Sequence, residues 1–575
     1  MNPIPSTFAL PKGALPAIEA RLARLEDERF VTRLWERDPT LWGDDPAHVE
    51  VARNRLGWLG VPERMRAAVD DLEAFAREVT LKGYTHAVLL GMGGSSLAPE
   101  VLRRALGLAP RSLDLEVLDS TSPAAVRAVT ESHDPAKTLF VVSSKSGGTI
   151  EVTSFERHCF EWARAARGDT AGGGFVAITD PGTGLERLAR ERGYRRTFTN
   201  QPDIGGRYSA LSYFGLVPAA LIGADLTALL ERALEEDRAS RAIATGGALP
   251  TGFVLGAVLG ELALQGRDKL TLVLGPEVAA FGTWVEQLVA ESTGKNGRGI
   301  VPIADEPLGL PESYADDRVF VAFSTEPLPA GVETGLEDLA RAGHPVLRWR
   351  DRDLASIGEE FLRWEIATAT AGAILGVDPF DEPNVTEAKQ ETQAVLAREQ
   401  ASPTPRATGN PLVSVEAPEL IARELAPVVN GRRDLGAWAA ALTTLVRPGD
   451  YFAVLAYLHR TPARHERLQR IRLAARGTTR AATTLGYGPR FLHSTGQLHK
   501  GGPNSGVFLL FTADDGGDVA IPGSPFGFAA LIRAQAAGDF EVLERRGRRV
   551  VHLHLGEHVE RELESIAEAI AAVRV

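Results

Sequence analysis

Short apolar runs alternate with stretches of helical periodicity from about Tyr84 onward. This alternation is typical of βα units, which build a parallel sheet with helices on its faces. In a first unit it predicts strands at residues 86–90, 113–118, 138–142 and 174–178, with helices starting near residues 96, 123, 148 and 185. We therefore predict an α/β fold.

The same pattern recurs twice further along the chain. A second unit has predicted strands at 269–274, 318–324 and 345–349, and predicted helices at 279–291, 335–341 and 354–375. A third has predicted strands at 451–455, 507–511 and 549–555, alternating with helices. We predict a helical lead-in, two α/β domains, a linker rich in Pro, Thr and Ser and a C-terminal α/β domain, with the bounds 1–60, 61–240, 241–400, 401–411 and 412–575.

Composition and charge exclude several classes of protein. The formal net charge of −12 argues against a general nucleic-acid binder, which needs a basic face to neutralise phosphates. The first residues lack the pattern of a signal peptide, and the most apolar window, 251–265, is interrupted by Glu261 and is too short to span a bilayer. A lone cysteine, Cys159, excludes an internal disulfide framework. We expect a cytoplasmic protein without membrane or nucleic-acid partners.

Two predicted strands end in loops that suit a phosphate group. One strand runs into a glycine-rich turn at 91–96, and another into the loop Ser-Ser-Lys-Ser-Gly-Gly-Thr at 143–149. Glycines let backbone N–H groups approach an oxyanion, and a helix N-terminus adds partial positive charge. Several hydroxyls in one loop can satisfy phosphate oxygens without a metal, so we expect no metal and no organic cofactor. A dinucleotide fits less well, because Ser96 breaks the Gly-x-Gly-x-x-Gly spacing.

Two further segments carry groups suited to acid–base chemistry. Two glycines precede Arg207 in the segment 204–209, so the backbone can approach a ligand while the guanidinium reaches across it. The predicted helix 279–291 delivers Glu291 into a polar Ser-Thr-Gly-Lys turn. A carboxylate placed there can act as a general base when partial burial raises its pKa toward neutrality.

Taken in order, these segments resemble the glucose-6-phosphate isomerase family. Residues 281–295 are similar to its Gln-Leu-x-x-Glu-Ser-x-Gly-Lys segment, 204–209 to its Gly-Gly-Arg-aromatic-Ser motif, and 375–389 to its last catalytic turn and helix. The resemblance implies two sugar isomerase (SIS-type) domains with parallel sheets, followed here by a C-terminal α/β domain. The whole chain resembles the isomerase half of fused transaldolase/glucose-6-phosphate isomerase proteins.

The resemblance also implies a role for each matching residue. Glu291 would move a proton between C2 and C1 of the sugar, and Arg207 would stabilise the enediolate. Lys389 would assist ring opening near the ring oxygen or O1. The implied phosphate ligands are Ser95, Ser144, Ser146 and Thr149, with Lys145 adding charge nearby.

The segment before Lys389 departs from the family pattern. Glu382 stands where Gln is usual, Asn384 where Gly is usual and Thr386 where Glu is usual. A carboxylate at 382 close to a phosphate dianion would be repulsive unless it were paired or protonated. We therefore carry over the role of Lys389 and assign none to Glu382.

The family's ring-opening histidine has no clear counterpart. His344 is the single histidine between the base and the final lysine, and it looks like the start of a strand. In the tail, His493 and His499 lie in a Gly-rich connector, which is either a displaced ring-opening group or a structural turn. A His-x-His-x3-His pattern at 552–558 is compatible with zinc, but no further ligand type completes a clear set, so an ordinary edge strand is favoured.

We expect an aldose–ketose isomerase that interconverts glucose 6-phosphate and fructose 6-phosphate in glycolysis and gluconeogenesis. Its partner is a small sugar phosphate, and a homodimer is one option for its assembly. One alternative is a non-catalytic sugar-phosphate-binding regulatory module, although such a module needs no base and no enediolate clamp. Another is an isomerase of a different hexose 6-phosphate such as mannose 6-phosphate, because C2 epimers differ only in one hydroxyl.

Overall fold

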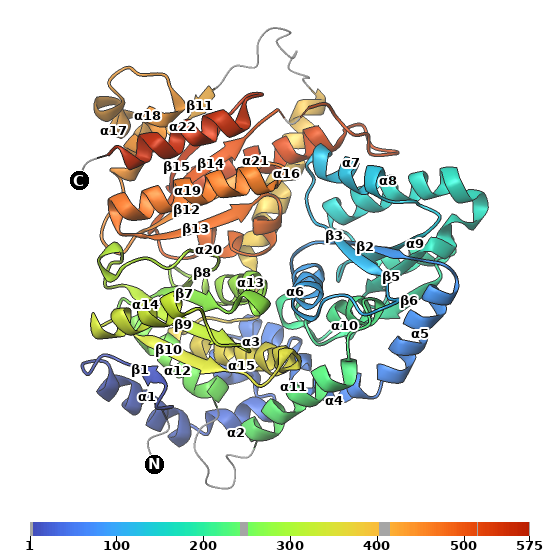
Figure 1. The fold of residues 1–575 in the computed structure, drawn as a ribbon, viewed down its shortest axis with the longest axis horizontal. Coiled ribbons are helices and arrows are strands. Elements are labelled where there is room, and N and C mark those ends of the chain that lie inside the picture. Colours follow the sequence, from blue (N-terminus) through green and yellow to red (C-terminus); the bar gives the residue numbers. More distant parts are fainter. Residues whose placement is uncertain (1–3, 242–250, 402–413, 515, 574–575) are drawn as a thin grey trace.

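The computed structural model describes residues 4–241, 251–401, 414–514 and 516–573, apart from the side chains of residues 385, 386, 388, 389 and 399–401. These residues form three five-stranded sheets flanked by helices (Figure 1). The predicted α/β fold is confirmed. The predicted linker, 401–411, lies outside the described residues from residue 402 onward.

The first sheet has the order β3-β2-β4-β5-β6, and all its neighbouring strands are parallel. Its strands are β2 (His86–Gly91), β3 (Asp114–Leu118), β4 (Thr138–Ser143), β5 (Phe175–Thr179) and β6 (Arg196–Thr199). The helices that follow them are α6 (Leu97–Leu106), α7 (Pro123–Ser132), α8 (Ile150–Arg167) and α9 (Gly184–Glu191). The chain changes direction across the sheet between β2 and β4, and ligands bind at such switch points beyond the strand ends. Both predicted phosphate loops leave from these two strands.

The second sheet has the order β1-β10-β9-β7-β8. Its strands are β7 (Lys269–Leu274), β8 (Val301–Ile303), β9 (Arg318–Ser324), β10 (Val346–Arg350) and β1 (Phe8–Ala9). Its helices are α13 (Phe281–Thr293), α14 (Ala330–Arg341) and α15 (Ile357–Leu375). The chain then continues into α16 (Pro383–Ala401), which packs on helices of the C-terminal domain. The lead-in is therefore not purely helical, because its strand β1 pairs antiparallel with β10 and closes one edge of this sheet.

The third sheet repeats the strand order of the second. Its order is β11-β15-β14-β12-β13, again with one antiparallel strand, β11, at the edge. Its strands are β11 (Ser414–Glu416), β12 (Tyr451–Tyr457), β13 (Ala482–Tyr487), β14 (Gly506–Thr512) and β15 (Arg549–His554). Its helices are α17 (Glu419–Val429), α18 (Leu435–Thr443), α19 (Pro462–Thr479), α20 (Gly496–Gly501), α21 (Phe528–Arg545) and α22 (Val559–Ala571).

Helices from two other parts of the chain complete the layers. The helices of the lead-in and of the segment between it and β2 are α1 (Leu15–Asp27), α2 (Phe30–Trp35), α3 (Pro46–Arg53), α4 (Val61–Arg66) and α5 (Val69–Leu81). Those between the first two sheets are α10 (Tyr213–Leu221), α11 (Leu226–Arg241) and α12 (Thr251–Leu264). The apolar α12 packs against α15 in the interior. Among the described helices, none is both long and apolar enough to cross a membrane.

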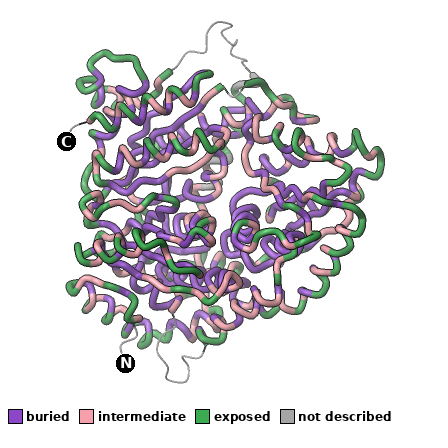
Figure 2. The backbone as a smooth tube through the Cα atoms, in the orientation of Figure 1, coloured by how far each residue is buried: buried purple, intermediate pink, exposed green. Residues whose placement is uncertain are grey.

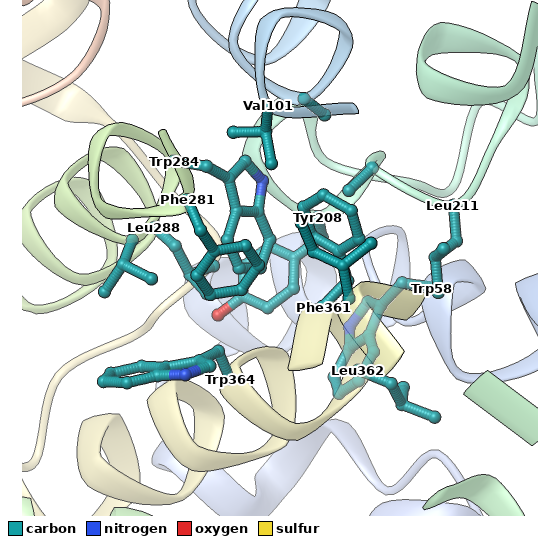
Figure 3. Packing of buried hydrophobic residues seen from close by; sticks show 14 of the residues in the cluster. Trp58, Val101, Tyr208, Leu211, Phe281, Trp284, Leu288, Phe361, Leu362 and Trp364 are labelled. Carbon is teal, nitrogen blue, oxygen red and sulfur yellow. The ribbon is translucent and has the colours of Figure 1, made fainter. Parts of the chain in front are cut away.

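Buried residues follow the sheets and the inner faces of the helices (Figure 2). One cluster of aromatic side chains joins the elements that carry the predicted catalytic residues (Figure 3). Trp284 of α13 meets Phe361 of α15 edge to face at 4.7 Å. Trp58 lies 5.3 Å from Tyr208, which follows Arg207 in the chain. Fully burying such a side chain stabilises the fold by roughly 1.5–3 kcal/mol, so this cluster fixes α13 relative to the Arg207 turn.

Candidate active site

The predicted base lies in the last turn of α13. Glu291 is 7% exposed, and its Oε2 accepts a hydrogen bond of 3.1 Å from Nε2 of Gln287, one helical turn earlier. Burial raises the pKa of Glu291 above the ordinary range, and the nearby guanidinium of Arg207 offsets part of that rise. A carboxylate in this setting is a stronger base than an exposed one.

Arg207 meets Glu291 inside the protein. It belongs to the short helix η5 (Gly206–Tyr208), and its Nη1 lies 3.3 Å from Oε1 of Glu291. Its Nε donates to Oγ of Ser292 at 2.8 Å, and its Nη2 donates to the carbonyl oxygens of Pro379 and Asp381 at 2.6 and 2.9 Å. These bonds hold the planar guanidinium in one orientation. The structure thus brings together the two residues that the sequence placed 84 positions apart.

The turn that carries Arg207 packs directly on the first phosphate loop. A Cβ added to Gly94 would lie 2.1 Å from the carbonyl oxygen of Gly206. Such a contact is impossible without a backbone shift, so the sequence needs glycine at this position. The close approach explains why the glycine-rich turn and the arginine turn belong to one site.

Glu382, to which the sequence assigned no role, also belongs to this cluster. Its Oε2 lies 3.0 Å from Nη1 of Arg207, the same nitrogen that approaches Glu291. Burial by itself would raise the pKa of Glu382, but Arg207 outweighs it and the pKa is below the ordinary value. From the sequence we expect this carboxylate to repel a phosphate group unless it is paired. The structure shows that it is paired, with Arg207.

The two phosphate loops are joined to each other. Oγ of Ser143 donates to the carbonyl oxygen of Ser95 at 3.1 Å. In the second loop the hydroxyls of Ser144 and Thr149 are 3.3 Å apart, and the N–H of Gly147 donates to Oγ of Ser144 at 3.2 Å. This gathers the hydroxyl groups at one end of β4.

The two lysines predicted for the site, Lys145 and Lys389, differ in what the structure shows of them. The ammonium of Lys145 is paired with Asp180 and donates to the carbonyl oxygen of Pro202 at 3.0 Å, so its charge is already balanced. Lys389 lies on α16, but its side chain is outside the described residues. Its role as the ring-opening cation stays a prediction.

The C-terminal domain reaches the phosphate loops through His493, at the end of the short helix η10 (Arg490–His493). The backbone oxygen of His493 accepts a hydrogen bond of 2.8 Å from Gln287, the residue that also holds Glu291. A cavity of about 70 Å³ is lined by the histidine and by two of the predicted phosphate ligands, Ser146 and Thr149. The tail therefore contributes directly to the candidate site.

A carboxylate from the first domain orients the His493 ring. Nε2 of His493 lies 3.0 Å from Oε1 of Glu151, and Nε2 of Gln535 donates to the same oxygen at 2.7 Å. A carboxylate on one ring nitrogen fixes the tautomer and leaves the other nitrogen for a ligand. Sequence reasoning missed Glu151 and Gln535. The sequence offers one signal for Glu151: it lies two residues after Thr149, a predicted phosphate ligand, at the start of α8.

The other two candidate histidines lie elsewhere. His499 is buried in the core beside the third sheet, where Nδ1 is 3.0 Å from the hydroxyl of Tyr451, and burial lowers its pKa to about 3. His344 packs against the rings of Tyr314 and Phe320, and burial lowers its pKa as well. Neither has a hydrogen bond or ring contact with Glu291 or the phosphate loops in the described part of the chain. Across those residues, no group of three or more His, Cys, Asp or Glu is placed to hold a metal.

Known proteins share both the sequence pattern and the fold. Residues 48–300 match the family described as phosphoglucose isomerase. A glucose-6-phosphate isomerase of Rubrobacter xylanophilus is 29% identical over 439 residues, covering 66% of this chain and 96% of that protein. One from Thermosynechococcus vestitus is 32% identical over 290 residues, covering 48% of this chain and 51% of that protein, about half its length.

Solved structures agree at the level of the fold. A glucose-6-phosphate isomerase from Chlamydia trachomatis superposes with a TM-score of 0.54 at 18% identity, over 68% of this chain and 87% of that one. A protein from Thermus thermophilus, solved as a hypothetical protein, has a TM-score of 0.54 at 24% identity, over 69% and 100%. The predicted resemblance is confirmed: the chain is similar to the phosphoglucose isomerase family over residues 48–300.

Proposed function

We propose that this protein interconverts glucose 6-phosphate and fructose 6-phosphate through a cis-enediol, as an enzyme of glycolysis and gluconeogenesis. The observation that carries the proposal is the pairing of a buried carboxylate, Glu291, with a fixed guanidinium, Arg207, beside two hydroxyl-rich loops. A binding module for sugar phosphates requires the loops but neither of the other two groups. The pairing therefore favours catalysis over a purely regulatory role.

The reaction needs three steps from these residues. The ring must open, and His493, oriented by Glu151, is suited to move a proton between the ring oxygen and the anomeric hydroxyl. Glu291 then takes the proton from C2 and returns it to C1. Negative charge develops on the two sugar oxygens meanwhile, and the fixed donors of Arg207 stabilise it more in the transition state than in the ground state.

The assignment of substrate rests on a comparison of two hexose phosphates. Initial rates measured by coupled assay with glucose 6-phosphate and with mannose 6-phosphate are expected to give the higher kcat/KM for the glucose epimer. A preference for mannose 6-phosphate would change the assigned substrate but not the assigned type of reaction. Absence of turnover with both, together with binding of fructose 6-phosphate, would favour the regulatory module.

The location of the protein is inferred from its cysteine content and from the proposed reaction. We infer a cytoplasmic enzyme, since the single cysteine, Cys159, is a buried free thiol and the reaction is one of central carbohydrate metabolism. A homodimer and a connection to a transaldolase stay predictions.

The phosphate loops can be tested by removing two hydroxyls. Replacing both Ser144 and Thr149 with Ala deletes the pair of oxygens that lie 3.3 Å apart. We expect KM for fructose 6-phosphate to rise at least about tenfold, because two hydrogen bonds to a charged ligand are lost. The change in kcat should be smaller. Thr153→Ala, one turn further along α8, is the matched control, and an unchanged KM in the double variant would remove these residues from the phosphate site.

The pH dependence tests the role of Glu382. Its negative charge raises the pKa of Glu291, and the base must be ionised to act. In Glu382→Gln that charge is gone and Arg207 is free to favour ionised Glu291. The pKa of Glu291 should therefore fall, and the acid limb of the kcat/KM profile should move to lower pH.

The control for this shift is Glu387→Gln. Glu387 lies five residues further along the chain, on α16, and pairs with Arg546 instead of Arg207. Its replacement should leave the profile in place. A shift of the Glu382→Gln profile to higher pH, or no shift, would contradict the coupling of the two carboxylates through Arg207.

A further inference from the structure

A second and larger cavity lies on the opposite side of the His493 segment. Its volume is about 520 Å³, within the roughly 300–1,000 Å³ of small-molecule sites. Its walls come from α6, α7 and β3 in the first domain and from α13 of the second. The third domain contributes the segment after β12, α19, and β13 with the loop that follows it. Of the residues predicted for catalysis or phosphate binding, His499, a ring-opening candidate, is the one that lines it.

The polar groups of this cavity are arranged mostly as ion pairs. Nε of Arg490 donates to Asp119 at 2.5 Å, and Arg104 pairs with Glu100 at 2.5 Å. At the mouth, His133 lies 2.7 Å from Glu116. Each pair presents a donor and an acceptor side by side, and in the two arginine–carboxylate pairs the charges cancel.

Two groups in the wall have hydrogen-bonding capacity left. Arg490 uses only Nε, so its other two nitrogens donate to no described residue. Glu286 accepts one hydrogen bond of 3.1 Å from the N–H of Ala304, and its second oxygen has no partner among the described residues. Burial raises the pKa of Glu286 to about 7, so this carboxyl carries a weakened charge near neutrality.

Such a wall selects against charged ligands. An anion would lie against the carboxyl groups of Asp119, Glu100 and Glu286, and a cation would lie against Arg490 and Arg104. Hydroxyl groups donate and accept at once, so they match the alternating donors and acceptors without a charge penalty. The rings of Tyr487 and Phe491, which also line the cavity, offer an apolar surface for the C–H face of a sugar ring.

We propose that this cavity is a second small-molecule site, which takes an uncharged polyhydroxylated ligand such as a mono- or disaccharide. It is distinct from the site for the sugar phosphate. Arg490, Phe491, Ser494 and Thr495 line it, whereas His493 in the same segment lines the candidate active site. Both sites therefore share one short stretch of chain.

The test uses calorimetric titration of the full chain with glucose, sucrose and trehalose. Fructose 6-phosphate is present at saturation, so that the candidate active site is occupied. We expect at least one of these sugars to bind. Absence of measurable binding up to about tens of millimolar, or tighter binding of a charged probe such as inorganic phosphate or spermidine at this cavity, would overturn the proposal.

Two substitutions locate the binding. Ala125 and Ala128 of α7 both line the cavity, and their i, i+3 spacing puts them on one face of the helix. Ala125→Trp and Ala128→Trp should each raise the sugar Kd at least tenfold. Ala124→Trp, on the same helix and outside the cavity wall, should leave Kd unchanged. Ala128 is exposed, so this variant should fold even if Ala125→Trp does not, and unchanged binding in the Ala128 variant would place the sugar elsewhere.

A kinetic consequence follows if the proposed isomerase function also holds. A bound sugar contacts the segment that carries His493, so it should change kcat for ring-closed fructose 6-phosphate by at least about twofold, and Ala128→Trp should abolish that response. The calorimetry needs no turnover. Failure of the isomerase proposal would therefore leave the binding result intact, and absence of calorimetric binding would leave the isomerase proposal intact.

Discussion

Glu291→Gln is expected to lower kcat for fructose 6-phosphate by at least about 10²-fold, which is the lower end of what general acid–base catalysis contributes. Gln keeps the shape of the side chain and can still accept a hydrogen bond from Gln287. It cannot take a proton from C2. The KM should therefore change little, because no phosphate contact is altered.

A second glutamate of α13 provides a close control. Glu286 is half-buried and also has a raised pKa, but it lines the second cavity. Glu286→Gln should fold as Glu291→Gln does and should keep its turnover. Near-normal kcat in Glu291→Gln would show that another group moves the proton, and equal losses in both variants would point to damage to the helix.

His493→Ala is expected to reduce kcat by about 10²-fold on sugars that are mainly cyclic, because it removes the group that moves the ring-opening proton. An aldose phosphate that cannot close a ring is the informative second substrate. Erythrose 4-phosphate has its fourth oxygen phosphorylated, so no five-membered ring can form. Isomerisation of this substrate should survive in His493→Ala and should be lost in Glu291→Gln.

The two substrates separate the roles of His493. If both rates fall equally, the histidine is needed for the structure of the loop or for proton transfer itself. If neither falls, ring opening belongs to another group, and Lys389 becomes the first to examine. Glu151→Gln, which leaves the ring in place but removes the carboxylate at 3.0 Å, should show a smaller loss with the same preference for the open-chain substrate.

The strands that the sequence did not predict are all at the edges of sheets. They are β1, β6, β8, β11 and β13, and each ends the strand order of its sheet. Central strands such as β2 and β4 are covered on both faces, so they must be apolar over their whole length. An edge strand pairs on one side only, and it can be short or polar, as in the Arg-Thr-Phe-Thr of β6. Its existence depends on a neighbour that is remote in sequence.

The sequence by itself determined the α/β class, the central strands and the local motifs, because each depends on residues within one element and its next turn. It therefore located Glu291, Arg207 and both loops. Only the tertiary structure decided which of the scattered polar groups meet. Glu382 pairs with Arg207, Glu151 orients His493, and His499 is enclosed in a core. These outcomes depend on how separate domains pack, since a side chain has a role only where the fold places its partner within bonding distance.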